Sequence, residues 1–247
     1  LGLLSGCGEK KQGDEKFVLN ASVCNVIDSL DPAMNTDTDA DSVFYALYEN
    51  LMRESDDGSG EVTLTNGMAK EYAEETNYDG SVTYRFTLRS TARWSDGEKV
   101  TADDFVYAWQ RLADPATASP NHTLMRVVAG YDEVRESGDV SLLGVKAKGE
   151  STFLVTLSRP CAYFITSVCT SPATAPLRRD LVEGNASWAA TADIVTNGPY
   201  TVGTWVKAAQ LQTKRSGEYY ESKLVVPDSI CFRFETDAQT NYEQLLA

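Results

Sequence analysis

Three alternating aspartates near the start of the sequence have the spacing most suggestive of a metal-binding loop. Asp37, Asp39 and Asp41 fit the first, third and fifth positions of a calcium loop. Such a loop then needs glycine at its sixth position and glutamate at its twelfth, where this sequence has Ser42 and Tyr48. We therefore interpret the aspartates as acids at the N-terminal end of a helix, where the helix dipole favours them, and predict no metal site.

Residues suited to acid–base catalysis are scarce. His122 is the sole histidine, and it lies in a loop-like segment that includes Pro120. Asp103 and Asp104 are adjacent in a predicted helix, so their side chains point apart and suit its first turn. The sequence also lacks the GxSxG, HExxH and Walker A motifs. We expect no enzyme activity and no cofactor.

The cysteines divide into one near the start and four further along the chain. The four do not form a CxxC pair, so their spacing argues against a metal knuckle. Cys161 and Cys169 can either form a disulfide or remain buried free thiols. The four cysteines are Cys24, Cys161, Cys169 and Cys231.

The first residues predict a lipid anchor. A short apolar run ends in Leu4-Ser5-Gly6-Cys7 and is followed by a polar, charged stretch, an order similar to a bacterial lipobox. We interpret residues 1–16 as a signal-peptide remnant, a lipidated Cys7 and a tether, with the lipid as the link to the membrane. The missing initial Met and the amphipathic final residues lead us to expect a fragment of a longer polypeptide.

The overall composition is that of a folded globular protein. Of 247 residues, 42% are hydrophobic, which is enough for a sizeable core. The formal net charge of −14 repels phosphate backbones, so we exclude nucleic acid as a partner.

Hydrophobic periodicity predicts a mixture of helices and strands. In the first part, we expect a strand at 17–23, a helix at 39–53, a turn at 55–60 and an alternating strand at 81–89. A helix should begin at Thr101, which can cap it by accepting from the backbone amide near Asp104, and end before Pro115. Further strands are expected at 143–145, 152–157, 200–206, 209–214 and 230–234, with a helix at 162–168. This order favours an α/β or α+β fold with mixed sheets, and the absence of a linker favours intercalated domains.

Several motifs occur in one order along most of the chain from about Leu30. They read LDP at 30–32, YENL at 48–51, YRFTLR at 84–89, RWSDG at 93–97, VTADDFVYAWQR at 100–111, DPATASP at 114–120 and IVTNGPY at 194–200. Together they resemble the family 5 extracellular solute-binding proteins of ABC importers, above all the oligopeptide-binding members.

That resemblance implies a three-domain, class II periplasmic-binding-protein-like clam-shell, here incomplete. Domain I would be discontinuous, with residues 17–50 as its first part and residues 181–247 as its continuation, ending at the approach to a missing domain III. Domain II would span residues 51–180.

The resemblance also implies a function outside the cytoplasm. The chain would be part of a monomeric, lipid-anchored protein at the cell surface or in the periplasm. It would capture oligopeptides and deliver them to the permease subunits of an ABC transporter.

Only a few ligand-binding positions carry over from the family. Thr36, Asp37 and Thr38 match a strip that pairs with the peptide backbone. Asn121 and His122 stand where relatives have a tyrosine, which is a departure from the family pattern. Tyr219 matches a tyrosine near the cleft.

Other functions remain open at the level of sequence. The ligand can be another solute, such as a dipeptide, nickel or an oligosaccharide, although a single histidine provides few of the imidazole ligands that suit nickel. An exported hydrolase that uses paired carboxylates and an adhesive lipoprotein are the alternatives from other classes.

Overall fold

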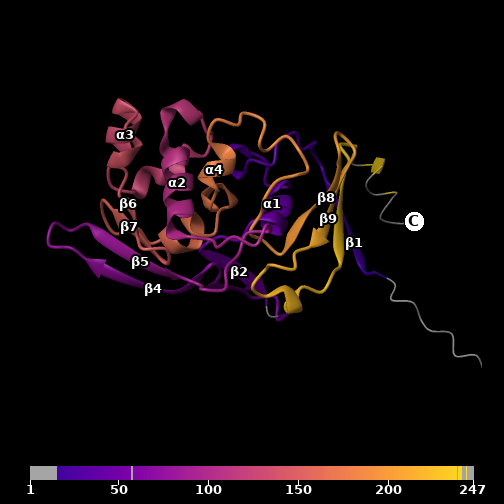
Figure 1. Ribbon diagram of the computed structural model, residues 1–247, viewed down its shortest axis with the longest axis horizontal. Coiled ribbons are helices and arrows are strands. Elements are labelled where there is room, and N and C mark those ends of the chain that lie inside the picture. Colours follow the sequence, from indigo (N-terminus) through magenta and orange to yellow (C-terminus); the bar gives the residue numbers. More distant parts are fainter. Residues whose placement is uncertain (1–15, 57, 238, 241–242, 244–247) are drawn as a thin grey trace, which may run out of the picture.

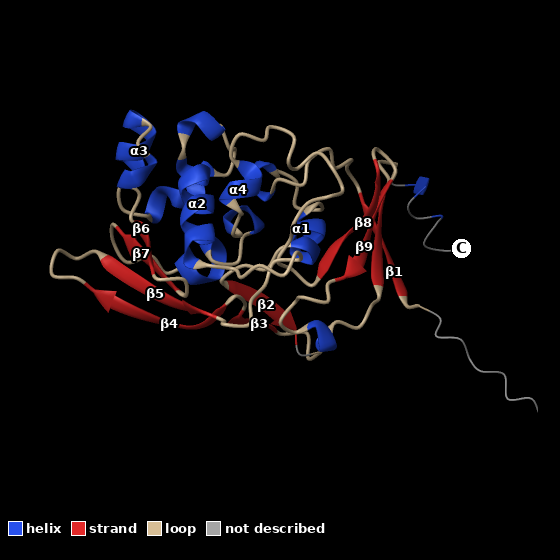
Figure 2. Cartoon of the chain, in the orientation of Figure 1, coloured by secondary structure: helices blue, strands red, loops and turns tan. Residues whose placement is uncertain are grey.

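Three β-sheets organise the part of the chain that the structure describes (Figures 1 and 2). The computed structural model describes residues 16–56, 58–237, 239–240 and 243. Helices and strands mix in all parts of this region, as the sequence predicts. Cys7 lies outside the described residues.

The first sheet joins both ends of the described chain. It contains β1 (Val18–Val23), β10 (Ser229–Phe234), β9 (Gln210–Arg215) and β8 (Tyr200–Val206), in that order. β1 runs parallel to β10, and the other pairs are antiparallel. The strands predicted at 17–23, 200–206, 209–214 and 230–234 are all confirmed within one residue at either end.

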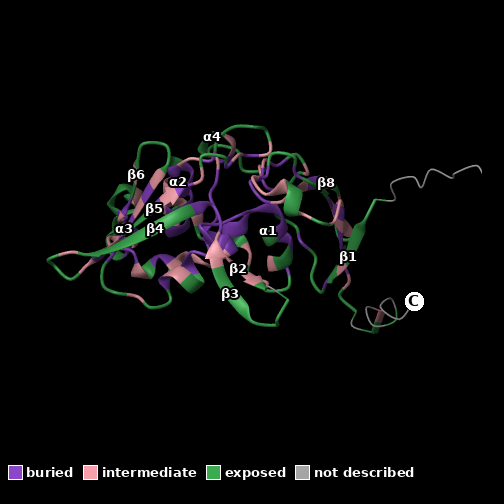
Figure 3. Cartoon of the chain, turned by 90° about the horizontal axis from the view of Figure 1, so that it is seen from below, coloured by how far each residue is buried: buried purple, intermediate pink, exposed green. Residues whose placement is uncertain are grey.

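The second sheet carries the main helices on one face (Figure 1). Its order is β4 (Ala69–Thr76), β5 (Val82–Leu88), β7 (Thr152–Leu157) and β6 (Val145–Lys148), all antiparallel. α2 (Ala102–Ala113) packs on β6 and β7, and α3 (Tyr131–Ser137) lies beside it. β4 exposes most of its residues (Figure 3).

Aromatic side chains fill the space between this sheet and α2. Trp109 meets Phe153 edge-on at a centroid distance of 5.2 Å, and Phe105 lies 5.5 Å from Phe153. The predicted cap at Thr101 forms as part of a capping box, in which the backbone N–H of Thr101 also donates to Asp104 Oδ2 over 2.8 Å. The same carboxylate accepts a hydrogen bond from Trp94 Nε1. Asp104 therefore both caps the start of α2 and connects the helix to the loop that contains Trp94.

The helix predicted at 39–53 is wrong in its second half. α1 spans only Asp41–Leu47, and the chain then extends into β2 (Met52–Asp56), which pairs with β3 (Val62–Asn66). Distant residues hold the extended segment: Asn197 bonds both the N–H and the C=O of Glu49, and Gly198 N–H donates to Leu47 O. A Cβ at Gly198 would lie 2.5 Å from the Leu47 carbonyl carbon, so glycine permits this close approach.

Smaller differences concern ends and types of elements. β6 begins at Val145, so the strand predicted at 143–145 is shifted toward the C-terminus. The helix predicted at 162–168 is a short π-helix, Phe164–Val168. The sequence predictions did not include α3, α4 (Arg179–Val182) or β2 to β4. The remaining 3-10 turns are Pro32–Met34, Pro115–Thr117, His122–Val127, Val140–Leu142, Pro172–Thr174 and Ser222–Leu224.

The four cysteines in the described region are free thiols, with Cys169 and Cys231 buried and Cys24 exposed. Within the same region, no helix combines the length and the apolar character required to cross a bilayer.

Candidate functional site

Residues 36–38, which we call the strip, follow a 3-10 turn that is fixed from both sides. Asp31 caps this turn by accepting from Ala33 N–H and pairs with both terminal nitrogens of Arg111. The chain leaves the turn in an extended conformation at Asn35. The strip therefore directly follows a turn that Asp31 holds in place.

Asn35 holds the central residue of the strip through its main chain. Its Oδ1 accepts from Asp37 N–H over 3.2 Å, and its Nδ2 donates to Asp37 O over 2.9 Å. Thr36 and Thr38, in contrast, are exposed. The N–H and C=O of Thr36 and the N–H of Thr38 have no hydrogen-bond partner among the described residues. Alternate residues of the strip thus present unpaired main-chain groups, as an open strand edge does.

The structure brings Asn121 to the strip from a distant part of the sequence. Asn121 Nδ2 donates to Asn35 O over 2.5 Å and to Ala33 O over 3.3 Å. Asn121 and the strip line one cavity of about 130 Å³, together with Pro172. Four of the predicted ligand-binding residues therefore share one small, open cavity.

His122 lies elsewhere, although it follows Asn121 directly. Its Nδ1 is 2.6 Å from the hydroxyl of Tyr131, and the two rings stack with centroids 6.2 Å apart. Burial, together with Arg135 and Arg126, lowers the pKa of the imidazole. The lining of the 130 Å³ cavity does not include His122, so its ligand contact stays a prediction.

The acidic residues before α1 support one another. Asp41 lies in the first turn of the helix, as predicted, but Ala40 is the cap residue and makes no side-chain cap bond. Asp37 accepts from Asp39 N–H and from Asn25, and Asp41 accepts from Asn35. Within the described residues, no group of three or more His, Cys, Asp or Glu side chains is placed to hold a metal ion.

Tyr219 belongs to a second group, which we call the Glu49 cluster: Glu49, Arg53, Tyr219, Tyr220 and Glu221. The Tyr219 hydroxyl donates to Glu49 Oε2 and accepts from Arg53 Nη1 over 2.9 Å. Arg53 Nη2 donates to Glu221 over 2.7 Å. Burial raises the pKa of the Glu49 carboxyl, although Tyr219 and Arg53 oppose the shift.

Three members of the Glu49 cluster, Glu49, Arg53 and Tyr219, line a cavity of about 390 Å³ that neighbours the strip. Pro172 lines both this cavity and the smaller one at the strip. Sequence reasoning placed Glu49 and Arg53 in a helix and missed their role in the site. The available signal was a charged residue, Glu49, inside the largely apolar run from Phe44 to Met52, with Arg53 directly after that run.

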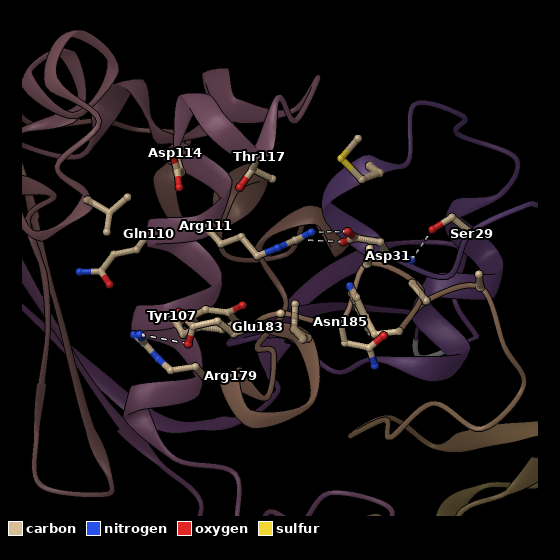
Figure 4. A pocket seen from close by; sticks show the side chains of 18 residues that line it. Ser29, Asp31, Tyr107, Gln110, Arg111, Asp114, Thr117, Arg179, Glu183 and Asn185 are labelled. Carbon is tan, nitrogen blue, oxygen red and sulfur yellow. Dashed lines mark hydrogen bonds and ion pairs between the residues drawn. The ribbon is translucent and has the colours of Figure 1, made fainter.

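A pocket of about 800 Å³ lies beside α2, and its lining includes none of the predicted ligand-binding residues (Figure 4). Both arginines in its lining face carboxylates: Arg111 pairs with Asp31, and Arg179 lies 3.8 Å from Glu183. Arg179 also covers the ring of Tyr107 at 4.8 Å. These pairs join α2, α4 and the turn before the strip.

Comparison with known proteins decides the family. The sequence profile of the bacterial extracellular solute-binding proteins, family 5 (middle), matches residues 63–247. The chain belongs to this family.

Relatives of this family 5 chain include oligopeptide-binding proteins of Escherichia coli and Bacillus subtilis. The periplasmic oligopeptide-binding protein OppA of Escherichia coli is 35% identical over 222 residues, covering 88% of the chain and 39% of the relative. The oligopeptide-binding protein OppA of Bacillus subtilis is 30% identical over 235 residues, covering 90% of the chain and 42% of the relative. The chain thus spans less than half the length of these curated relatives.

Solved structures share the fold of the family 5 chain. Haemophilus influenzae OppA in complex with the peptide RPPGFSPFR matches with a TM-score of 0.84 at 30% identity, covering 94% of this chain and 45% of that one. The unliganded, open murein tripeptide-binding protein MppA matches with a TM-score of 0.85 at 26% identity, covering 94% of this chain and 44% of that one. The mixed α/β class predicted from the sequence is therefore confirmed.

Proposed function

We propose that this chain is the N-terminal part of a peptide-capturing subunit of an ABC importer, with the strip as its main-chain contact. The observation that carries the proposal is the set of unpaired main-chain groups at Thr36 and Thr38, beside Asn121. Family membership and the names of the oligopeptide-binding relatives support it.

The chemistry of the strip suits ligands of many sequences. Each residue of an extended peptide carries one N–H and one C=O, whatever its side chain. Peptides can therefore add to an open edge as an extra strand, and their main chain supplies the affinity. Asn35 occupies the main-chain groups of Asp37, so only alternate residues face the ligand, as strand addition requires.

A proline substitution tests the main-chain contact directly. In the complete polypeptide, Thr36→Pro removes one N–H, and the extended conformation of Asn35 is one that tolerates a following proline. We expect peptide affinity to fall roughly ten-fold, the value of about one good hydrogen bond. Isothermal titration calorimetry with an unlabelled pentapeptide provides the measurement.

The matched control is Thr36→Ala, which removes the side chain but keeps the N–H. It should bind peptides nearly as well as the unaltered protein. If the alanine variant loses as much affinity as the proline variant, the side chain is the contact and the strand-addition account is wrong.

The anchor, the partners and the domain division are further parts of this proposal. We assign lipidation to Cys7 and place the protein outside the cytoplasm as a monomer, where it delivers peptides to permease subunits. Residues 17–50 and 181–247 would form a discontinuous domain I, an assignment supported by the parallel pairing of β1 with β10. Residues 51–180 would form domain II.

Fractionation of expressing cells tests the anchor. Cys7→Ala in the complete polypeptide should move the protein from the membrane fraction to the soluble fraction. Cys24→Ala removes an exposed thiol and should leave the protein with the membranes. If both variants fractionate alike, Cys7 is not the anchor.

A further inference from the structure

The 390 Å³ cavity beside the strip has apolar walls and an acidic lining. Its volume equals that of about a dozen water molecules at ~30 Å³ each. It can therefore accommodate one long side chain with some water, but not a whole peptide. The apolar and aromatic residues of its lining are Tyr45, Tyr48, Met52, Pro172, Ala175, Pro199 and Tyr219.

Two carboxylates in the lining have unused hydrogen-bonding capacity. Glu49, only 6% exposed, uses Oε2 for Tyr219 and Arg53, whereas Oε1 accepts no hydrogen bond from any described residue. Glu54 is exposed, and its carboxylate makes no hydrogen bond or ion pair within the described part of the chain. The cavity thus has one acid at its buried end and one at its rim.

The cation in the lining does not balance these acids. Arg53 lies 3.4 Å from Glu49 and 2.7 Å from Glu221, so its guanidinium is shared between two carboxylates. Burial, and then the negative charges of Asp41 and Glu54, raise the pKa of the Tyr45 hydroxyl at the cavity. The local charge is therefore negative even with Arg53 counted.

We propose that this cavity accepts a lysine or arginine side chain of the bound peptide, which makes basic peptides the preferred ligands. The inference rests on the proposed peptide-binding function. A basic side chain has an apolar stem for the tyrosine, methionine and proline walls and a charged head for Glu49 and Glu54. Shared lining by Pro172 places the cavity next to the strip, so a peptide on the strip can insert one side chain there.

A neutral aliphatic side chain can contact the apolar walls of the cavity but cannot bind the Glu49 carboxylate at its buried end. It would take water from the Glu49 carboxylate without replacing the lost hydrogen bonds, which disfavours binding. An acidic side chain would add repulsion from both carboxylates. Lysine and norleucine have similar stems, so comparing them isolates the charge.

The test uses the complete polypeptide and sets of alanine-based pentapeptides. Each set places lysine, norleucine or glutamate at one of the five positions, and calorimetry measures the dissociation constants. We expect lysine to bind at least about ten-fold more tightly than norleucine at one position. Glu54→Gln should reduce that ratio by about three-fold, since the group is exposed, and Glu49→Gln by more.

Glu136→Gln is the matched control, because it removes an exposed carboxylate on α3, far from the cavity. It should leave the lysine-to-norleucine ratio unchanged. Glu54→Gln keeps the test decisive even if Glu49→Gln does not fold.

The outcomes separate this inference from the function on which it rests. Equal affinity for lysine and norleucine at every position, with pentapeptides still bound, overturns the basic cavity and leaves peptide capture in place. A preference for glutamate that disappears in Arg53→Met also overturns it, in favour of an acid-binding cavity. If no pentapeptide binds, the proposed function itself is wrong.

Discussion

The strip and the Glu49 cluster border neighbouring cavities, but they are built in opposite ways. The strip presents main-chain groups on exposed residues, and Asn35 and Asn121 support it through amide hydrogen bonds. The Glu49 cluster is a charged network in which Glu49 is almost fully buried and joined to Tyr219 and Arg53. The strip offers main-chain groups that any peptide can bind, and the Glu49 cluster offers a negative charge.

This difference teaches that the site that accepts peptides of many sequences and the site that selects a charged side chain place different demands on the stability of the fold. Exposed main-chain groups remain hydrated without a ligand, so the strip requires little from the rest of the fold. A buried carboxylate requires compensation at all times. Substitutions in the cluster should therefore change the stability of the protein, whereas substitutions in the strip should change mainly its affinity for peptides.

The largest expected effect is on the stability of the cluster. Arg53→Met leaves Glu49 and Glu221 without their shared cation, and we expect the free energy of unfolding to fall by about 3 kcal/mol at pH 7. Urea denaturation of the complete polypeptide measures it. The loss should shrink at acid pH, where protonation of Glu49 removes the buried charge. A loss below ~1 kcal/mol would show that the cluster is no more demanding than a surface pair.

Removal of one hydroxyl from the cluster should have a smaller effect. Tyr219→Phe removes the donor to Glu49 and the acceptor for Arg53, at a cost of about 2 kcal/mol because both partners are charged. The same denaturation experiment measures this loss. Tyr220→Phe is the matched control, since its hydroxyl lies 3.4 Å from Arg53, a longer contact than the 2.9 Å one that Tyr219 makes. Equal losses for the two variants would contradict the role given to Tyr219.

The strip should respond in affinity more than in stability. Asn35→Ala frees the main chain of Asp37, and we expect the free energy of unfolding to fall by only about 1 kcal/mol. Peptide affinity should fall at least as far in free energy, because the alternation of bonded and unbonded residues is lost. Calorimetry and denaturation on the same sample test this, and a stability loss without an affinity loss would contradict the comparison.

The smallest effect is the pH dependence that Glu49 itself contributes. Its pKa is raised above the ordinary glutamate value of 4.5, first by burial. The stability from this group is thus fully present below pH 4.5 and is lost as the pH rises through the raised pKa. The free energy of unfolding of the unaltered protein, minus that of Glu49→Gln, should decrease as the pH rises through this window. If this difference does not change with pH, the charge of Glu49 is fully stabilised by its neighbours and its pKa is not raised.

Local sequence predicts the regions whose structure is decided by neighbours along the chain. The alternation of Val82, Tyr84, Phe86 and Leu88 gives β5, whose buried residues are these four. The capping box of Thr101 and Asp104 gives the start of α2. In these regions, the spacing of apolar residues and the capping residues favour the same secondary structure that the tertiary contacts stabilise.

The same reasoning fails between Tyr48 and Met52. Helical periodicity continues through this segment, but from about 150 positions away Asn197 bonds the main chain of Glu49 and Gly198 bonds that of Leu47, just before the segment. The side chain of Asn50 also makes a long-range bond, in which Nδ2 donates to the hydroxyl of Thr174 over 2.8 Å. These long-range hydrogen bonds outweigh a weak local preference, and they are invisible in a hydrophobic pattern.

The sequence alone determined the fold class, α2, the family and six of the strands (β1, β5, β7, β8, β9 and β10), because ordered motifs and local periodicity can be read without knowing which distant residues are in contact. The tertiary structure alone decided that Asn121 lies beside the strip while His122 turns to Tyr131, and that Glu49, Arg53 and Tyr219 form one charged network. These arrangements depend on which distant segments meet. The burial that raises the pKa of Glu49 and the main-chain groups left unpaired at Thr36 and Thr38 exist only after the chain has folded.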